Sequence, residues 1–398
     1  MSEIKKLIER LCPEGVEYIE LGVIAQVIRG ERITKRDLVE DGEYPVMSGG
    51  VSYFGRYKNY NREANTITVA QYGSAGYVSF IKEKFWANDV CYSVLPSERL
   101  NNKYCYYVLC NLQNTLYSLT TKAIPDCLPK EKLTSLEIPV PPIEVQSKIV
   151  EILDNFTELE AELEAELEAR RKQYEYYRNQ LLTFDKDKGA RFDVKWMKLG
   201  EAIVSLNTGL NPRKFFRLNT PDANNYYITI KEIKGGRIMP NEKTDRINDE
   251  ALRLCNNRSN LEIGDVLFSG TGTIGETAII EEYPTNWNIK EGVYTIKPNR
   301  DIINSRYLRN ILRSEDTMKS IMNKVAGGTV KSIPMKELKN ISIPIPPLSE
   351  QQRIVSILDR FEALTTDLQS GLPAEIEARR KQYEYYREKL LTFKRKSA

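Results

Sequence analysis

The chain has 398 residues, of which 41% are hydrophobic and 28% are charged, and its formal net charge is only +3. This composition is ordinary for a globular protein of two to three domains, and it excludes a polycation that binds nucleic acid through its overall charge. The sequence contains no histidine. That excludes Ser-His-Asp and Cys-His catalysis, His-ligated zinc and imidazole proton transfer, and leaves only carboxylates, Lys or Tyr for any catalysis.

Two further features bear on the compartment. No apolar run approaches the ~18 residues that a membrane span requires, and residues 1–12 carry acidic side chains where a signal peptide has its apolar core. The cysteines include no Cys-x-x-Cys pair, and we interpret them as free thiols in a reducing compartment: Cys12, Cys91, Cys105, Cys110, Cys127 and Cys255. We therefore expect a cytoplasmic protein that has no metal site and does not enter a membrane.

In chain order, residues 1–11 form an amphipathic pattern that predicts a short helix. The segment Val-Glu-Tyr-Ile-Glu-Leu-Gly at 16–22 returns at 194–200 as Val-Lys-Trp-Met-Lys-Leu-Gly, and it marks the start of a globular part in each half. In the first part, β-rich runs at 66–70, 77–81 and 90–95 are separated by Gly, Asn and Pro. This pattern predicts mixed α/β or mostly β structure with long loops.

Each globular part ends in a proline-rich stretch, Ile-Pro-Val-Pro-Pro-Ile at 138–143 and Ile-Pro-Ile-Pro-Pro-Leu at 343–348. Because proline fixes φ and disfavours helix in the preceding residue, we expect an extended, stiff connector at each place. After the first connector, apolar residues recur at steps of three, four or seven up to residue 184. This stripe predicts one helix from residue 144 to 184, about 60 Å long at 1.5 Å per residue.

The end of this helix, residues 169–184, is repeated at 378–393 with 14 of 16 positions identical, 209 residues later (378 minus 169). Such a repeat identifies an internal duplication. The first helix contains Glu-Leu-Glu-Ala three times over 158–169, whereas Ser-Gly-Leu-Pro at 370–373 predicts an interruption of the second helix. The globular parts have diverged, and the second is longer by 27 residues between the shared motifs (149 minus 122).

A glycine-rich motif, Ser-Gly-Thr-Gly-Thr-Ile-Gly at 269–275, follows an apparent strand. A dinucleotide site requires a helix next, but residues 277–280 favour another strand. The corresponding place in the first half keeps Gly73 and Gly76 and has Gln71 instead of the first glycine. We therefore predict a two-glycine turn between strands in both halves. The sequence also lacks a Walker-type loop and an Asn-Pro-Pro-Tyr motif, so it shows neither an ATPase site nor an aminomethyltransferase site.

Loops in both halves combine basic, aromatic and amide side chains, which suit phosphate anchoring and hydrogen bonding to base edges. The candidate DNA-binding residues are Arg56, Lys58, Arg62, Gln71, Tyr72, Ser74, Lys122, Arg213, Lys214, Ser269, Thr271, Thr273 and Lys331. The alternative interpretation is that these are ordinary polar loops.

On the repeated helix, Tyr174, Tyr177 and Leu181 share one face and predict a packing seam, whereas Tyr176 projects elsewhere. We interpret the outward face of both copies as a surface that binds two copies of one partner. Its candidate residues are Arg170, Arg171, Tyr176, Arg379, Arg380 and Tyr385. The alternative interpretation of the basic residues is a solvated helix face.

The two proline-rich stretches, the helix start Glu-Gln-Gln-Arg-Ile-Val at 350–355 and the repeated helix Ala-Arg-Arg-Lys-Gln-Tyr-Glu-Tyr-Tyr-Arg resemble the DNA specificity subunit of Type I restriction–modification systems. The segment Gly-Gly-Thr-Val-Lys-Ser-Ile-Pro at 327–334, with its counterpart Thr-Lys-Ala-Ile-Pro at 121–125, resembles the end of a target recognition domain in that family. The resemblance covers nearly the whole chain.

The resemblance implies an α/β (α+β) fold with a pseudo-twofold internal repeat, in which two long antiparallel coiled-coil helices separate two globular target recognition domains. The recognition domains are then residues 1–140 and 191–345, and the spacer helix regions are 141–190 and 346–398. The implied chain is non-catalytic, binds no cofactor itself and reads a bipartite, asymmetric sequence in double-stranded DNA. The length of the helices sets the gap between the two half-sites.

The implied partners are two modification subunits, which carry S-adenosylmethionine, and two restriction subunits, which use ATP and Mg. Two alternatives remain at this point. One is a coiled-coil scaffold that holds protein partners without reading DNA sequence, and the other is a fused single-chain enzyme of the restriction–modification type.

Overall fold

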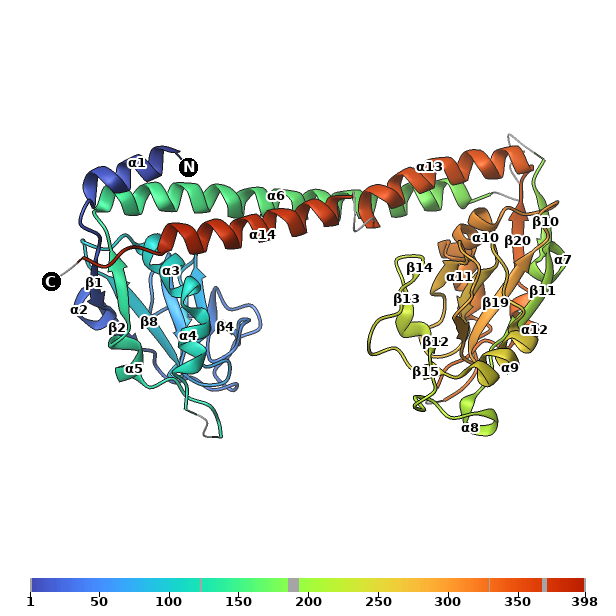
Figure 1. The fold of residues 1–398 in the computed structure, drawn as a ribbon, viewed down its shortest axis with the longest axis horizontal. Coiled ribbons are helices and arrows are strands. Elements are labelled where there is room, and N and C mark those ends of the chain that lie inside the picture. Colours follow the sequence, from blue (N-terminus) through green and yellow to red (C-terminus); the bar gives the residue numbers. More distant parts are fainter. Residues whose placement is uncertain (1, 122–123, 185–192, 329, 367–370, 397–398) are drawn as a thin grey trace. The chain divides into compact units, whose positions relative to one another are not determined.

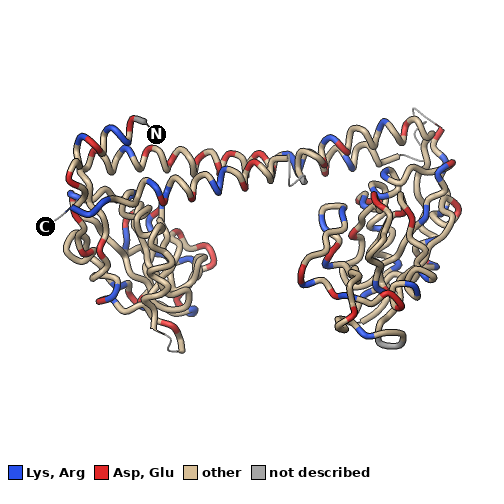
Figure 2. The backbone as a smooth tube through the Cα atoms, viewed as in Figure 1, with Lys and Arg blue, Asp and Glu red and all other residues tan. Residues whose placement is uncertain are grey.

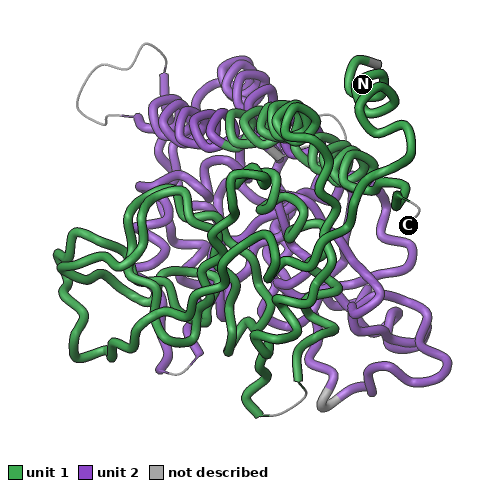
Figure 3. The backbone as a smooth tube through the Cα atoms, turned by 90° about the vertical axis from the view of Figure 1, so that its left-hand side faces the viewer, with its two compact units in different colours: residues 1–164, 376–398 green, residues 165–375 purple. Residues whose placement is uncertain are grey.

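The structure is a computed structural model of the chain, and it describes all residues except 1, 122–123, 185–192, 329, 367–370 and 397–398. The chain divides into two compact units, unit 1 (residues 1–164 and 376–398) and unit 2 (residues 165–375), which Figure 3 colours separately. The domain ranges predicted from the sequence follow the repeat, whereas the units divide the long helical regions between them. Within the described residues, none of the helices is long and apolar enough to cross a membrane.

Unit 1 is a mixed α/β unit, and Figure 1 labels several of its elements. Its strands are β1 (Glu17–Glu20), β2 (Ala25–Arg29), β3 (Tyr44–Met47), β4 (Gly55–Tyr57), β5 (Thr66–Ala70), β6 (Val78–Ile81), β7 (Trp86–Ala87), β8 (Cys91–Pro96) and β9 (Glu137–Val140). Its shorter helices are α1 (Ser2–Leu11), α2 (Leu21–Ile24), α3 (Asn102–Asn111), α4 (Gln113–Ser118) and α5 (Lys130–Thr134). The helix predicted at 1–11 and the strands predicted near 66–70, 77–81 and 90–95 are confirmed.

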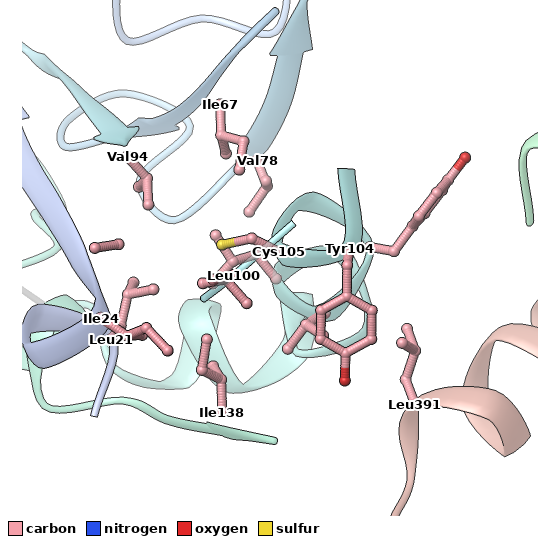
Figure 4. Close-up of a cluster of buried hydrophobic side chains, with 14 of the residues drawn as sticks. Leu21, Ile24, Ile67, Val78, Val94, Leu100, Tyr104, Cys105, Ile138 and Leu391 are labelled. Atoms are coloured by element: carbon pink, nitrogen blue, oxygen red, sulfur yellow. The ribbon is translucent and has the colours of Figure 1, made fainter. Parts of the chain in front are cut away.

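Strands β2, β8, β5 and β6 form an antiparallel four-stranded sheet in that order, and β4, β3 and β7 form a smaller sheet beside it. Helix α3 covers the larger sheet, because its Tyr104, Cys105 and Leu109 are fully buried in the same core as Ile67 and Val94 of β5 and β8. Figure 4 shows Ile67, Val94 and Cys105 in this cluster. The helix begins where Asn101 accepts a hydrogen bond from the backbone N–H of Tyr104, a typical N-cap.

The C-terminal segment completes the core of unit 1. Leu390 and Leu391 of α14 (Leu372–Leu391) are buried among the residues of this core, and Figure 4 shows Leu391 entering it. The backbone of Val16 donates to Lys394 O at 2.8 Å and accepts from Lys396 N at 2.9 Å. Both ends of the chain therefore belong to the same unit and are joined by hydrogen bonds.

Unit 2 repeats this plan with additions. Its strands are β10 (Lys195–Lys198), β11 (Ile203–Thr208), β12 (Asn225–Ile228), β13 (Ile233–Lys234), β14 (Arg237–Ile238), β15 (Arg246–Ile247), β16 (Val266–Ser269), β17 (Thr277–Ile279), β18 (Trp287–Ile289), β19 (Val293–Pro298) and β20 (Ser342–Ile345). Its helices are α7 (Leu199–Ala202), α8 (Pro212–Phe215), the 3-10 helix η1 (Ile230–Glu232), α9 (Asp249–Ser259), α10 (Ser305–Leu312), α11 (Glu315–Met322), α12 (Met335–Lys339) and α13 (Leu348–Thr366).

The sheet β11-β19-β16-β17 of unit 2 corresponds to β2-β8-β5-β6 of unit 1. The helices that follow also correspond, since Tyr104 in α3 donates a hydrogen bond to Pro139 O and Tyr307 in α10 donates one to Pro344 O. The hairpin β13–β14 belongs to the extra length of unit 2. The structure thus confirms two related but diverged globular parts.

The proline-rich stretches are extended, as predicted, and they also pair. Strand β9 pairs antiparallel with β1, with Pro139 opposite Tyr18, and β20 pairs in the same way with β10, with Pro344 opposite Trp196. Each ladder has only two strands, so a proline whose missing N–H faces outward breaks no bond within the ladder. Each predicted connector is therefore a strand within its globular unit.

The long helices confirm the predicted difference between the two halves. Helix α6 (Ile143–Leu182) is continuous over 40 residues, about 60 Å at 1.5 Å per residue. In the second half, α13 is described to Thr366 and α14 begins at Leu372, with Pro373 in its first turn, where proline is tolerated. Gly371 before α14 is not helical, and Ser370 of the predicted interruption lies outside the described residues. In unit 1, α14 runs antiparallel to the first part of α6, because Tyr386 contacts Phe156 whereas Arg380 pairs with Glu164.

Candidate nucleic-acid interface

The predicted two-glycine turn joins antiparallel strands in both units, β5 to β6 and β16 to β17. Gly73 and Gly76 have φ of 77° and 88°, and Gly272 and Gly275 have φ of 82° and 101°, a region that favours glycine. No helix follows either turn, so the pattern at 270–275 is not a dinucleotide fingerprint. The turn lies at one end of the strands of each four-stranded sheet. We call this end of the sheet the loop end of its unit.

Several separate segments meet at the loop end of unit 1. The backbone N–H of Ser74 donates to Gly49 O at 2.7 Å, and that of Gln71 donates to Val90 O at 2.9 Å. Leu128 N donates to Gln71 O at 2.9 Å. Hydrogen bonds therefore hold the turn, the loop after β3, the start of β8 and the segment before α5 together as one surface.

Two of the candidate arginines in unit 1 bond to backbone carbonyls. Arg56 donates from Nε and Nη2 to the carbonyls of Gly42 and Glu43, both at 2.5 Å. Arg62 donates to Ser93 Oγ at 2.8 Å, to Asn61 O at 2.7 Å and to Arg29 O at 3.0 Å. Both guanidinium groups therefore hold loops in place. To contact a phosphate, each would have to donate to it in addition to these acceptors or in place of one of them.

The other candidates of unit 1 differ in exposure. Gln71 is 9% exposed, and its side-chain oxygen is buried without a hydrogen-bond partner. Tyr72 is half-buried, and a hydrogen bond with Cys127 raises the pKa of its hydroxyl. Lys58 is exposed and Ser74 is half-buried, and Lys122 lies outside the described residues. Lys58, Tyr72 and Ser74 therefore have side-chain surface accessible to a ligand.

The loop end of unit 2 has the same scaffold with different side chains. Gly272 N donates to Lys331 O at 2.9 Å and Ile333 N donates to Gly270 O at 2.9 Å, as Leu128 does to Gln71 in unit 1. Ser269 is fully buried, and its hydroxyl donates to Thr273 O at 2.6 Å and accepts from Glu276 N at 2.8 Å. The hydroxyl of Ser269 is thus occupied within the turn.

The remaining candidates of unit 2 lie closer to solvent. Thr271 is half-buried, and Thr273 and Lys331 are exposed. Arg213 and Lys214 belong to α8, but their side chains lie outside the described part of the structure. A hollow between β11, α9 and α12 adds polar groups at this end, and its lining includes Asn207, Thr208, Asn257 and Arg258.

The loop after β2 in unit 1 was not among the sequence-based candidates. It carries Arg32, Lys35 and Arg36, which are exposed and form no ion pair among the described residues. Asn88 holds it at the loop end by accepting from Ile33 N at 3.0 Å and donating to Ile33 O at 3.2 Å. The sequence does contain a signal for this loop, namely the run of basic residues at 29–36. This run begins at the end of β2, as residues 207–217 begin at the end of the corresponding strand of unit 2.

The repeated helix presents the predicted seam and outward face. Tyr174 is buried, and Tyr177 stacks on Phe361 of α13 with ring centroids 5.4 Å apart. Tyr176 and Tyr385 are 60% and 58% exposed, and each makes an edge contact with the tyrosine that follows it. The two copies of the helix therefore present the same exposed ring.

The candidate arginines of this face differ between the copies. Arg170 and Arg379 each donate to the glutamine three residues later, at 3.0 Å and 3.3 Å. Arg380 pairs with Glu160 at 2.7 Å and with Glu164 at 2.8 Å, whereas Arg171 makes no such pair among the described residues. Arg380 is thus partly committed to the contact between α14 and α6.

The described residues contain no group of three or more His, Cys, Asp or Glu side chains placed to hold a metal ion. The polar groups at the two loop ends are amides, hydroxyls and cations. Such groups can form hydrogen bonds with phosphates and base edges.

Comparisons with known proteins agree with this geometry. Residues 13–169 and 193–378 each match the Type I restriction modification DNA specificity domain. The chain is 32% identical, over 99% of its length and 100% of the relative, to a protein of Haemophilus influenzae named as a type I restriction enzyme specificity subunit. It is 31% identical, over 99% of its length and 98% of the relative, to the specificity subunit of EcoR124I/EcoR124II from Escherichia coli.

Solved structures share the fold. The crystal structure of a Type I restriction–modification S subunit from M. genitalium matches with a TM-score of 0.60 at 19% identity, over 95% of this chain and 96% of that one. A chain from a study of complex assembly in a type I R-M system matches with a TM-score of 0.59 at 15% identity, over 95% and 97%. These findings give no support to the interpretation as a scaffold that does not read DNA.

Proposed function

Because the chain belongs to the family of Type I restriction–modification DNA specificity subunits, we propose that the loop end of each unit reads one half of a split sequence in double-stranded DNA. The two units carry different side chains on one backbone scaffold, so the two half-sites differ and the whole target is asymmetric. The loop ends supply hydrogen bonds to base edges, and the exposed cations around them supply contacts to phosphates.

The observation that carries this proposal is the pair of two-glycine turns. In both units the turn is held by the same backbone bonds, from Leu128 to Gln71 in unit 1 and from Ile333 to Gly270 in unit 2. The residue at this position is an amide in one unit and a glycine in the other. The two turns thus share their backbone hydrogen bonds and differ in their side chains. This is expected of two modules that both bind DNA but read different sequences.

The chain acts in this proposal as a non-catalytic subunit. Two modification subunits, which bind S-adenosylmethionine, dock on the outward faces that contain Tyr176 and Tyr385, and they methylate the DNA that this chain has selected. Two restriction subunits, which use ATP and Mg, join the same assembly. The recurrence of one exposed face on both copies of the helix supports two copies of one partner.

A domain exchange tests the proposal. Residues 16–136 are replaced by the equivalent segment of a relative with a known target, the chain is produced with its modification subunit, and methylated sites are mapped by single-molecule sequencing. One half-site is expected to change and the other to stay the same. A change in both half-sites contradicts independent reading, and the unmodified chain in the same host is the control.

A further inference from the structure

An arginine cluster lies where α10, α13 and the second part of α6 meet in unit 2. Arg309 of α10 is only 5% exposed and pairs with Glu362 of α13. Arg313, one turn further along, lies 3.7 Å from the other oxygen of the same carboxylate. Arg178 of α6 lies over the ring of Tyr174, with its guanidinium carbon 5.6 Å from the ring centroid. Arg309 and Arg313 therefore share one carboxylate, and this carboxylate and all three guanidinium groups lie within electrostatic range of the Tyr174 hydroxyl.

The same cluster contains buried donors without acceptors. The atoms are Tyr174 Oη, Arg178 Nε, Arg309 Nε, Arg313 Nη1 and Asn310 Nδ2, all buried without a hydrogen-bond partner. Two acceptors nearby in the sequence are also orphaned, Asn179 Oδ1 and Asp359 Oδ1. The first is a neutral amide oxygen, and the carboxylate of the second already pairs with Arg306 at 3.0 Å. Leaving buried donors unpaired is costly, and most of these belong to cations. The missing group is thus an acceptor with negative charge.

The hairpin β13–β14 reaches this cluster with its tip. Gly236 has a φ of 78°, and a methyl group built on it would lie 2.7 Å from Arg309 Nη1 and 3.1 Å from Glu362 Oε1. Only glycine therefore fits at this contact. The flanking residues Lys234 and Arg237 are exposed and form no ion pair within the described part of the chain. Figure 2 shows basic positions on this hairpin.

Unit 1 has uncharged side chains at the positions that correspond to Arg309 and Arg313. Since Tyr104 corresponds to Tyr307, the positions of Arg309 and Arg313 correspond to Tyr106 and Cys110. Tyr106 is part of an aromatic group, with its ring 5.3 Å from that of Tyr107. No counterpart of the β13–β14 hairpin occurs among the described residues of unit 1. Arg387 over Tyr383 repeats the contact of Arg178 with Tyr174, and its Nε is likewise buried without a partner, so only the part of the junction formed by Arg309, Arg313 and the hairpin is confined to the second half.

We propose that this junction, formed by Arg178, Arg309, Arg313 and the tip residues Lys234 and Arg237, binds a phosphate group of the DNA backbone. A tetrahedral oxyanion accepts hydrogen bonds from several guanidinium groups at once, which matches the set of unpaired donors. Helix α10 and the hairpin pack on β17, whose first residue, Thr277, follows the turn. The junction is thus separate from the turn and anchors DNA without reading bases. This inference rests on the proposed function.

The test uses the full chain assembled with its modification subunits and a fluorescent duplex that contains the target. The variant is Lys234→Ala/Arg237→Ala, which removes two exposed cations and no buried group. The matched control is Lys319→Ala/Lys324→Ala in the same unit, whose lysines already pair with Glu315 and Glu337 at 2.6 Å and 3.7 Å. Dissociation constants are measured over a series of salt concentrations.

Each phosphate contact adds about 0.9 to the slope of log affinity against log salt. The magnitude of this slope is therefore expected to fall by about 1–2 in the hairpin variant and to stay at the wild-type value in the control. The wild type, the hairpin variant and the control should all methylate the same sequence. A second measurement compares the Tm of the complex in phosphate and in chloride at equal ionic strength, for the wild type and for Arg313→Gln.

A normal slope in the hairpin variant, together with a Tm that responds equally to phosphate and chloride, overturns the proposal. A normal slope with a phosphate-specific rise in Tm that Arg313→Gln abolishes supports the phosphate site and identifies free phosphate as its ligand. A wild-type complex without sequence-dependent methylation contradicts the proposed function itself. A specific wild-type complex, with an unaltered slope in the variant and no phosphate-specific rise in Tm, contradicts only the junction.

Discussion

The ring of Phe156 in α6 stacks on the ring of Tyr386 in α14, with centroids 5.4 Å apart and an interplanar angle of 27°. Unit 2 contains the equivalent pair with the partners' helices exchanged, Tyr177 of α6 on Phe361 of α13, at 5.4 Å and 28°. The duplicated helix thus makes the same aromatic contact in each unit. This contact places the helix against its unit in one register.

Removing one of these rings should destabilise its unit. Phe156→Ala is expected to lower the free energy of unfolding by about 1–3 kcal/mol, less than the ~3–5 kcal/mol of a fully buried phenylalanine because Phe156 is half-buried. Urea unfolding of the full chain measures the change. Tyr385→Ala is the control, since that ring is 58% exposed and should cost under about 0.5 kcal/mol. Equal losses in both variants contradict a structural role for the stacked pair.

The length of α6 should set the gap between the half-sites. Deleting one Glu-Leu-Glu-Ala unit, residues 162–165, shortens the helix by about 6 Å. Since duplex DNA rises about 3.4 Å per base pair, the tolerated spacer should shorten by one or two base pairs while both half-sites stay the same. Sequencing of methylated sites measures the spacer. A length-preserving replacement of the same residues by Ala-Leu-Ala-Ala is the control, and an active deletion variant with the original spacer excludes the helix as a ruler.

The exposed tyrosines should each control the docking of one modification subunit. Tyr176→Ser or Tyr385→Ser alone should reduce the number of bound modification subunits from two to one, and the double variant should bind none. Native mass spectrometry counts the subunits. Tyr283→Ser, at a tyrosine that is 66% exposed on another surface, should leave both in place. Two bound subunits in the double variant place the docking surface elsewhere.

Buried thiols and phenols should make the protein sensitive to alkaline pH. Burial raises the pKa of Cys91 from 9.0 to about 12 and that of Tyr92 from 10.0 to about 12. Above pH 9 for the thiol and above pH 10 for the phenol, the unfolded chain loses the proton and the folded chain keeps it. Stability therefore falls as pH rises toward 12, by up to about 1.4 kcal/mol per pH unit for each group.

Urea unfolding at pH 8, 10 and 11 measures this loss. Cys91→Ser should be less stable than the wild type at pH 8 and should show a shallower decline above pH 9, because a serine hydroxyl does not titrate there. An identical pH dependence in the variant means that Cys91 does not contribute.

The sequence was sufficient for the repeat, the long helix and the two turns, because each of these depends on local patterns. The period of apolar residues predicted α6, and the Ser-Gly-Leu-Pro segment at 370–373 predicted that the second helix restarts at Pro373. The partners of Arg56 and Arg62 could not be predicted in this way. All but one of their acceptors are backbone carbonyls, up to 33 residues away, and no residue type marks such an acceptor in a sequence; the exception is Ser93 Oγ.

Two long-range pairings were also beyond local reasoning. The ladder of β1 with β9 joins segments more than a hundred residues apart, and the bonds of Val16 with Lys394 and Lys396 join the two ends. The position of the basic loop with Arg32 and Arg36 depends on the hydrogen bond from Ile33 N to Asn88, 55 residues away, which holds this loop at the loop end. Position in space, not composition, decided its relevance.

The bonds between Val16 and residues 394–396 have a consequence for biosynthesis. The ribosome makes Val16 before any residue of unit 2, but it makes the segment 394–396 that pairs with Val16 only after all of unit 2. Unit 1 therefore waits, with an incomplete core that lacks Leu390 and Leu391, while all of unit 2 is translated. A nascent chain that stalls within unit 2 leaves the earlier-made unit unfinished and exposed to proteases, so only chains translated beyond Leu391 complete its core.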